Sequence, residues 1–189
     1  MHMSTCFVIV DLQQGTQEWR VWRHKGIGAS DAPVIMGENP RKTAKALLEE
    51  KRGPARDYGQ NEAMRLGTQL EPEARERYMA KTGRDVRAAC LQSTRFDWLR
   101  ASVDGLSVKG DAVVEIKCGN SAYRIASQSG SVPGYYVGQI QHILAVTGFG
   151  TMDCWFYWPG CPGLLLTVER DEAYIERLMD MEMKFWNSI

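Results

Sequence analysis

The sequence predicts an α/β (α+β) fold in which helices flank a central mixed β-sheet. Its first half carries helical patterns, whereas its second half carries five strand-like runs interrupted by a helical pattern. Strands that are followed by a crossover helix and further strands are typical of a mixed sheet with helices packed on its faces. The 189 residues have the length of one ordinary domain, with no internal repeat and no convincing linker, so we expect residues 1–189 to form a single domain.

Four helical segments are expected in the first half, the last of them as one long helix or two abutting ones. Thr16 and Thr43 precede two of them, and their side-chain oxygens can cap the first backbone N–H groups. Pro72 lies inside the longest helical pattern and is expected to kink or break the helix directly after Glu71, because proline lacks the N–H and clashes with the preceding turn. The expected helices cover residues 16–23, 30–37, 43–52 and 61–82.

The second half is rich in β-branched, aromatic and aliphatic runs that glycine, proline and polar residues separate. Two helical patterns lie among these runs, over residues 134–146 and 171–186. The expected strands cover residues 84–92, 98–103, 112–117, 151–158 and 164–168.

The composition excludes several classes of protein. Hydrophobic residues make up 44% and charged residues 24% of the chain, which is the balance of a soluble globular protein and not of a disordered one. No apolar run approaches the roughly 20 residues of a membrane-spanning helix, and the run 6–10 is too short for the core of a signal peptide. The five cysteines match neither a zinc site nor a disulfide framework. We therefore expect a cytoplasmic protein without a membrane partner.

The formal charge is zero, with 23 basic and 23 acidic residues, which argues against a protein that coats nucleic acid nonspecifically. The charges are unevenly spread, however. Residues 20–56 contain nine Lys or Arg against four Asp or Glu, whereas residues 169–189 contain six acids against three bases. The sequence thus predicts one basic face and one acidic helix. The basic run 41–56 is either a solvated helix face or a set of phosphate contacts.

Two carboxylates and an ammonium are expected to converge on one face of the sheet. Asp104 is predicted to end a strand at a turn made by Gly105. Glu115 and Lys117 lie two residues apart on the next strand, so their side chains leave the same face. If the two strands are neighbours in a hairpin, Asp104 lies close to Glu115.

Such hard oxygen ligands hold Mg²⁺ or Mn²⁺, and the metal polarises a phosphate and lowers the pKa of bound water. A lysine beside them orients that water or stabilises the charge that develops on the phosphorane. The alternative is that Asp104 is a turn residue, while Glu115 and Lys117 form a solvated ion pair worth less than about 1 kcal/mol. The apolar neighbours Val114 and Ile116 favour the site, because they place the charges on a core strand.

Further segments complete an ordered set of motifs. The set is Trp22-Arg23, Gly26-Ile27-Gly28-Ala29-Ser30-Asp31, Gly67-Thr68-Gln69-Leu70-Glu71-Pro72, Asp104-Gly105, Glu115-Ile116-Lys117-Cys118 and Tyr135-Tyr136-Val137-Gly138-Gln139-Ile140-Gln141. In this order, the motifs resemble the phage lambda exonuclease-like family of YqaJ-type viral recombinases and alkaline exonucleases, within the PD-(D/E)XK nuclease superfamily. The resemblance runs from about residue 17 to about residue 158 and implies a restriction-endonuclease-like nuclease core.

The resemblance implies a role for each residue of the carboxylate cluster. Asp104 and Glu115 would be metal-binding carboxylates, with the backbone carbonyl of Ile116 as a further ligand. Glu71, from the helical half, would complete the site for a second metal ion. Lys117 would be the catalytic lysine.

The resemblance also implies residues that place the substrate. Gln139 would help to place the attacking water or the scissile phosphate; Gln141 lies about 200° around the same helix and cannot point at the same site. Arg23 and Ser30 would form a pocket for the 5′-phosphate of a DNA end, with a fork of guanidinium donors, a hydroxyl and backbone N–H groups. The alternative for this pair is a surface arginine and a helix cap.

By resemblance, the chain is expected to be a Mg²⁺-dependent deoxyribonuclease, with Mn²⁺ as an alternative and two ions per active site. It would digest linear double-stranded DNA from 5′-phosphorylated ends in the 5′-to-3′ direction, release 5′-mononucleotides and leave a 3′ single strand for an annealing recombination protein. A homotrimeric ring around DNA is implied as well. The alternatives are an endonuclease on the same fold and a non-catalytic protein that binds DNA ends in recombination.

Overall fold

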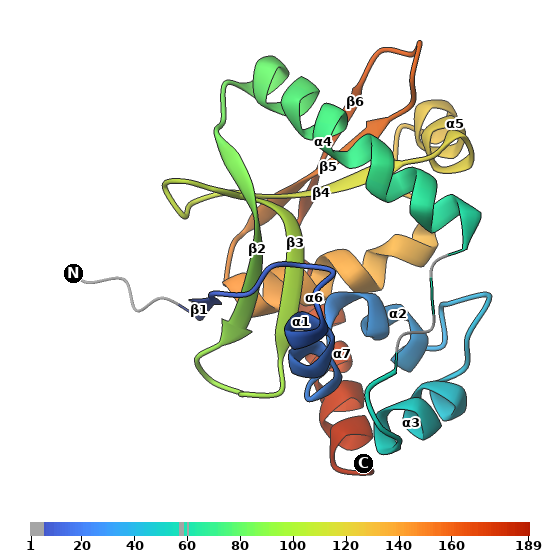
Figure 1. Cartoon of the computed structure of the whole chain (residues 1–189), viewed down its shortest axis with the longest axis vertical. Coiled ribbons are helices and arrows are strands. Elements are labelled where there is room, and N and C mark those ends of the chain that lie inside the picture. Colours follow the sequence, from blue (N-terminus) through green and yellow to red (C-terminus); the bar gives the residue numbers. More distant parts are fainter. Residues whose placement is uncertain (1–5, 57–58, 60) are drawn as a thin grey trace.

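A computed structural model describes residues 6–56, 59 and 61–189 of the chain. This described part contains a mixed sheet of six strands in the order β1-β2-β3-β4-β5-β6 (Figure 1). Neighbouring strands are antiparallel except for β4 and β5, which are parallel, so the predicted mixed sheet is confirmed. The strands are β1 (Phe7–Val10), β2 (Val86–Ser93), β3 (Arg100–Ser107), β4 (Val113–Cys118), β5 (Thr151–Tyr157) and β6 (Leu164–Glu169).

The predicted helices of the first half and the last helix are present. Thr16 caps α1 by accepting from the N–H of Trp19 at 3.3 Å, and Thr43 caps α3 by accepting from the N–H of Ala46 at 3.2 Å. Among the described residues, no helix combines the length and apolar character needed to cross a membrane. The elements are α1 (Gln17–His24), η1 (Ala29–Asp31), α2 (Ala32–Ile35), α3 (Ala44–Arg52), α4 (Glu62–Thr82), α5 (Asn120–Ser129), η2 (Gly134–Tyr136), α6 (Val137–Thr147) and α7 (Glu172–Trp186).

Helix α4 runs through Pro72 without a break, so the alternative of one long helix is confirmed and the break after Glu71 is wrong. A kink at Pro72 stays a prediction. The missing N–H of Pro72 weakens the helix locally. Ala74 and Tyr78, which follow it, are completely buried. Tertiary packing of this apolar face therefore holds the helix together across the proline.

Two elements are not predicted from the sequence. Helix α5 belongs to the crossover that joins the parallel strands β4 and β5. Its buried positions are Ala122 and Ala126, and four of its ten residues are Ser or Asn, so its apolar pattern is weak. Strand β1 lies at the edge of the sheet, where Val8 and Ile9 are both exposed and produce no alternation.

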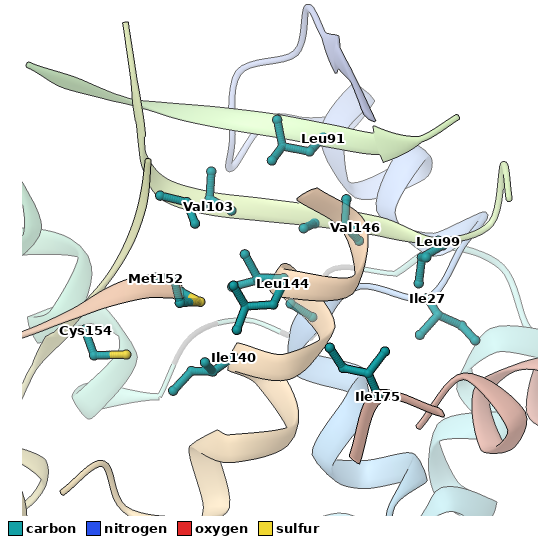
Figure 2. Packing of buried hydrophobic residues seen from close by; sticks show 14 of the residues in the cluster. Ile27, Leu91, Leu99, Val103, Ile140, Leu144, Val146, Met152, Cys154 and Ile175 are labelled. Carbon is teal, nitrogen blue, oxygen red and sulfur yellow. The ribbon is translucent and has the colours of Figure 1, made fainter. Parts of the chain in front are cut away.

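The main core lies between α6 and one face of the sheet (Figure 2). Ile140 and Leu144 of α6 are buried together with Val103 of β3 and Met152 of β5. Helix α6 is therefore fixed against the strands that frame the candidate site.

The other face of β4 and β5 is covered by α4. Because side chains alternate along a strand, Glu115 and Lys117 leave β4 on the side of α6, away from this second cluster. The apolar side chains of Val114 and Ile116 thus lie on the opposite face of the sheet from Glu115 and Lys117. The second cluster contains Ala74, Tyr78, Val114, Ile116 and Trp155.

Candidate active site

Strands β3 and β4 pair over a short stretch and then diverge (Figure 1). The antiparallel pairing ends at Gly105 and Val114. Beyond that pair, Oδ2 of Asp104 accepts a hydrogen bond from the backbone N–H of Ile116 at 2.7 Å. The Asp104 carboxylate therefore takes the place of the strand carbonyl that would accept from this N–H if the pairing of β3 and β4 continued.

The turn predicted at Gly105 is wrong. Gly105 lies inside β3, which continues to Ser107. A Cβ atom at Gly105 would lie 2.6 Å from Cγ1 of Val114 and 2.9 Å from Cγ2 of Val86. Glycine is needed here because neighbouring side chains occupy the space of a Cβ, not because the chain turns.

Glu115, Lys117 and Gln139 form a closed set of hydrogen bonds between β4 and α6. Nζ of Lys117 donates to Oε1 of Glu115 at 2.7 Å and to Oε1 of Gln139 at 2.9 Å. Nε2 of Gln139 donates to the same Oε1 of Glu115 at 2.5 Å. The ammonium also lies 4.2 Å from the ring centroid of Tyr136, a cation–π contact. Lys117 is thus held in one position.

The charged side chains of this cluster lie close enough to shift one another's pKa. Burial lowers the pKa of the Lys117 ammonium, but the carboxylates of Glu115 and Asp104 outweigh burial and raise that pKa. With both carboxylates charged, the Lys117 ammonium is charged at neutral pH and donates hydrogen bonds. Burial first, and then the carboxylates of Glu115 and Glu71, raise the pKa of Asp104 well above its ordinary value.

Glu71 approaches the cluster from α4. Burial raises the pKa of its carboxyl, and Glu115 adds to the rise, although the Arg75 guanidinium opposes both. Arg75 is paired with Glu71, and its Nε donates to the backbone carbonyl of Asp104 at 2.9 Å. Arg75 thus joins the carboxylate on α4 to strand β3. Arg75 is not among the site residues predicted from the sequence, although its position four residues after Glu71 on a helix is the signal for such a pair.

The donor set suits a hard divalent cation. Glu115 is buried, and its Oε2 has no hydrogen-bond partner in the described part of the chain. An unpaired buried carboxylate oxygen is unfavourable unless a cation satisfies it. Within residues 6–56, 59 and 61–189, however, no three His, Cys, Asp or Glu side chains have already converged as a metal cluster. The suitability of the site for a divalent cation therefore rests on Asp104 and Glu115, because the Glu71 carboxylate is paired with Arg75.

Arg23 and Ser30 lie apart from the carboxylate cluster, in an open cavity of about 890 Å³. The cavity is lined by α1, η1, α3 and the start of α4. The guanidinium of Arg23 donates to the hydroxyl of Ser30. Seven lining residues are basic and two are acidic, so the cavity favours an anion. The charged residues are Arg20, Arg23, Arg41, Lys42, Lys51, Arg56 and Arg65, with Asp31 and Glu50.

The basic run 41–56 divides between two environments. Arg41, Lys42 and Arg56 line the cavity. Lys51 is buried and lies 2.9 Å from Oδ2 of Asp31. The interpretation of the run as a solvated helix face is therefore wrong for Lys51, because the loop after α1 covers this side of α3.

Helix α4 connects the cavity to the carboxylate cluster. Arg65 lines the cavity, and Glu71 lies six residues later, about 9 Å along the helix axis. Gly67, between them, lies near the end of β4, where an added Cβ would be 3.8 Å from the carbonyl oxygen of Cys118. Helix α4 therefore fixes the position of the cavity relative to the carboxylate cluster.

Two residues close in sequence to the predicted site residues, Gln141 and Cys118, have other roles. Gln141 donates to the carbonyl of Glu169 and accepts from the N–H of Asp171, away from Lys117. Burial raises the pKa of the Cys118 thiol to about 12, so the thiol is protonated at neutral pH and is no nucleophile.

Among solved structures, the alkaline exonuclease LHK-Exo from Laribacter hongkongensis matches the fold with a TM-score of 0.79, at 28% sequence identity and with 91% of each chain covered. The same enzyme in complex with dAMP matches with a TM-score of 0.80 at the same identity and coverage. A phage-related exonuclease from Haemophilus somnus 129PT has the fold at a TM-score of 0.57 and 11% identity, with 86% of this chain and 91% of that chain covered. The fold is that of the alkaline exonucleases, and the predicted fold class is confirmed.

The chain belongs to the YqaJ-like viral recombinase domain family, whose sequence pattern matches residues 18–150. Uncharacterized protein YqaJ of Bacillus subtilis (strain 168) is 32% identical over 181 residues, which cover 93% of this chain and 56% of that protein. The chain thus spans little more than half the length of this curated relative. The family that the ordered motifs predict is confirmed.

Proposed function

We propose that the chain is a divalent-metal-dependent deoxyribonuclease that digests linear double-stranded DNA from its ends. The observation that carries this proposal is the convergence of Asp104, Glu115 and Lys117 where β3 and β4 separate. Membership of the YqaJ-like viral recombinase family supports it. So does the similarity to LHK-Exo, an alkaline exonuclease solved in complex with dAMP, because a nucleoside monophosphate is the product class of an exonuclease.

In the proposed site, Asp104 and Glu115 hold Mg²⁺, with Mn²⁺ as the alternative and the carbonyl of Ile116 as a further ligand. Glu71 contributes to a second ion. When bound, the ions polarise the scissile phosphate and make water a better nucleophile. The unpartnered Oε2 of Glu115 supports this assignment.

Lys117 stabilises the negative charge that develops on the phosphate, because its ammonium is charged and positioned by three contacts. Gln139 holds the ammonium of Lys117 and Oε1 of Glu115 in place, and it orients the attacking water or the scissile phosphate. Because Lys117 and Gln139 both donate to Oε1 of Glu115, Oε2 is left for a cation.

Arg23 and Ser30 bind the 5′-phosphate of the DNA end through the guanidinium and the hydroxyl. The other basic residues of the cavity, apart from the buried Lys51, bind backbone phosphates, which give affinity without sequence preference. This arrangement explains how a chain with a formal charge of zero binds DNA, because the basic residues are gathered around one cavity.

Capture of the 5′-phosphate makes digestion proceed from 5′ to 3′. The products are 5′-mononucleotides and a 3′ single strand, which is the substrate of a single-strand-annealing recombination protein. We further propose that the chain acts as a single nuclease domain in the cytoplasm and that three copies form a ring around the DNA.

The experiment that tests this function is digestion of one linear duplex labelled at either end, with and without a 5′-phosphate, in Mg²⁺ and in EDTA. Circular duplex and the Lys117→Ala protein are the controls. We expect mononucleotides from 5′-phosphorylated ends in Mg²⁺ alone, with circles intact and the variant inactive.

Three other outcomes would replace the proposal. Cleaved circles would indicate an endonuclease on the same fold. Binding of ends without hydrolysis in Mg²⁺ or Mn²⁺ would indicate a non-catalytic end-binding protein. Release from the 3′ end first would contradict the assignment of Arg23 and Ser30.

A further inference from the structure

The Lys51 ammonium is buried between α3 and the loop that joins α1 to η1. Only 4% of the Lys51 side chain is exposed. Its Nζ lies 2.9 Å from Oδ2 of Asp31 and donates to the carbonyls of Gly26 at 2.7 Å and Arg23 at 3.3 Å. Three acceptors match the three N–H groups of an ammonium. Lys51 therefore serves the loop and does not reach out to a ligand.

Asp31 is the carboxylate that Lys51 neutralises. Oδ2 of Asp31 also accepts from the N–H of Gly28 at 3.1 Å. Burial raises the pKa of Asp31, but the Lys51 ammonium and the Arg23 guanidinium outweigh burial and hold that pKa below its ordinary value. Asp31 is thus charged at neutral pH, and it lines the same cavity as Arg23 and Ser30.

The loop between α1 and η1 is also fixed at the start of β3. Ile27 donates its N–H to the carbonyl of Trp98 at 2.7 Å and accepts from the N–H of Arg100 at 3.0 Å. A Cβ atom at Gly26 would lie 2.6 Å from the carbonyl oxygen of Trp98, so glycine permits this close approach. The loop is therefore held by β3 and by Lys51 of α3.

We infer that Lys51 is a positioning residue that sets the preference for a 5′-phosphate over a 5′-hydroxyl end, an inference that rests on the proposed function. Lys51 holds the backbone from which Arg23 and Ser30 reach the cavity. Lys51 also neutralises the Asp31 carboxylate. Without that counterion, the carboxylate beside the pocket would repel a phosphate. A 5′-hydroxyl end carries no such charge, so its digestion does not depend on Lys51.

The test compares kcat/KM for two linear duplexes that differ only in a 5′-phosphate or a 5′-hydroxyl. For Lys51→Met, we expect the phosphate-to-hydroxyl ratio to fall by about tenfold or more, while kcat/KM on hydroxyl ends stays within about twofold of the wild type. Lys45→Met is the matched control, because Lys45 is exposed on the same helix and outside the cavity lining. Its ratio should equal that of the wild type.

Lys51→Met leaves a buried carboxylate unpaired and can prevent folding, so the double variant Asp31→Asn/Lys51→Met is measured beside it. Its ratio should lie below that of the wild type, because the carbonyls of Arg23 and Gly26 lose their donor. A wild-type ratio in the variants that fold, as judged by circular dichroism melts, would overturn the inference. Failure of the wild type to digest either duplex in Mg²⁺ would instead overturn the proposed function, and the inference with it.

Discussion

Oδ2 of Asp104 accepts a hydrogen bond at 2.7 Å from the backbone N–H of Ile116, across the gap where β3 and β4 separate. This contact keeps a half-buried carboxylate within electrostatic reach of Glu115 and Glu71. Like charges close together and partly shielded from water are unfavourable without a counterion. The position of the Asp104 carboxylate is therefore better explained by a role in catalysis than by a contribution to the stability of the fold.

Replacing Asp104 with Asn keeps an oxygen for the N–H of Ile116 but removes the negative charge. We expect nuclease activity to fall by about 100-fold or more. In EDTA we expect Tm to be at least that of the wild type, because repulsion from Glu115 and Glu71 is relieved. Activity assays and thermal melts of one preparation check both. A variant that melts well below the wild type would show that the charge serves stability.

Replacing Arg75 with Met removes the counterion of Glu71. We expect a lower Tm in EDTA, because Glu71 is then unpaired beside other carboxylates, and a larger rise in Tm on addition of Mg²⁺ than in the wild type. Arg77→Met is the control on the same helix, since Arg77 is exposed and its pair contributes less than about 1 kcal/mol. Equal Mg²⁺-induced shifts in the two variants would contradict the link between Arg75 and the site.

Two glycine substitutions are expected to have opposite effects on stability. Gly105→Ala should lower the free energy of unfolding by about 1–3 kcal/mol, because its Cβ would meet Val114 and Val86. Gly67→Ala should raise it by about 0.5–1 kcal/mol, because the position is helical and the Cβ finds ordinary contact distance. Urea denaturation measures both, and destabilisation by Gly67→Ala would contradict the packing described for α4.

The buried pair of His142 and Glu182 predicts a pH dependence of stability. Nδ1 of His142 lies 2.7 Å from Oε1 of Glu182, and its Nε2 lies 2.8 Å from the carbonyl oxygen of Arg100. Burial lowers the pKa of His142, but Glu182 and the Arg100 carbonyl outweigh burial and raise that pKa above its ordinary value of 6.5. The contribution of His142 is therefore fully present below the unfolded-state pKa and is lost as pH rises through the folded-state pKa.

Urea denaturation of the wild type and His142→Gln checks this sign. The wild type should exceed the variant in free energy of unfolding by more at about pH 6 than at about pH 9. A difference that grows toward alkaline pH would mean that His142 is neutral in the folded protein.

Features that depend on neighbouring residues are predictable from the sequence. The helix caps Thr16 and Thr43 are predictable because each hydroxyl accepts a hydrogen bond from a backbone N–H only three residues later. Glu115 and Lys117 share a face because every strand alternates. These local rules place the charged pair on a core strand before the neighbours of that strand are known.

Features that depend on distant contacts are not predictable in this way. Gly105 is mistaken for a turn residue because its constraint comes from Val86 and Val114, which only the folded sheet brings near. Lys51 belongs to a basic run, and only the loop after α1 makes it a buried ion. Helix α5 buries two alanines, whose small side chains give little periodic signal.

The most direct test of the claim that Asp104, Glu115 and Lys117 form a hydrolytic centre is product analysis of one 5′-phosphorylated linear duplex. Wild type and Glu115→Gln are incubated with it in Mg²⁺ and in EDTA, and released nucleotides are separated by chromatography. We predict 5′-mononucleotides from the wild type in Mg²⁺ and none in EDTA or from the variant. Equal release by Glu115→Gln, or end binding without release by the wild type, would contradict that claim.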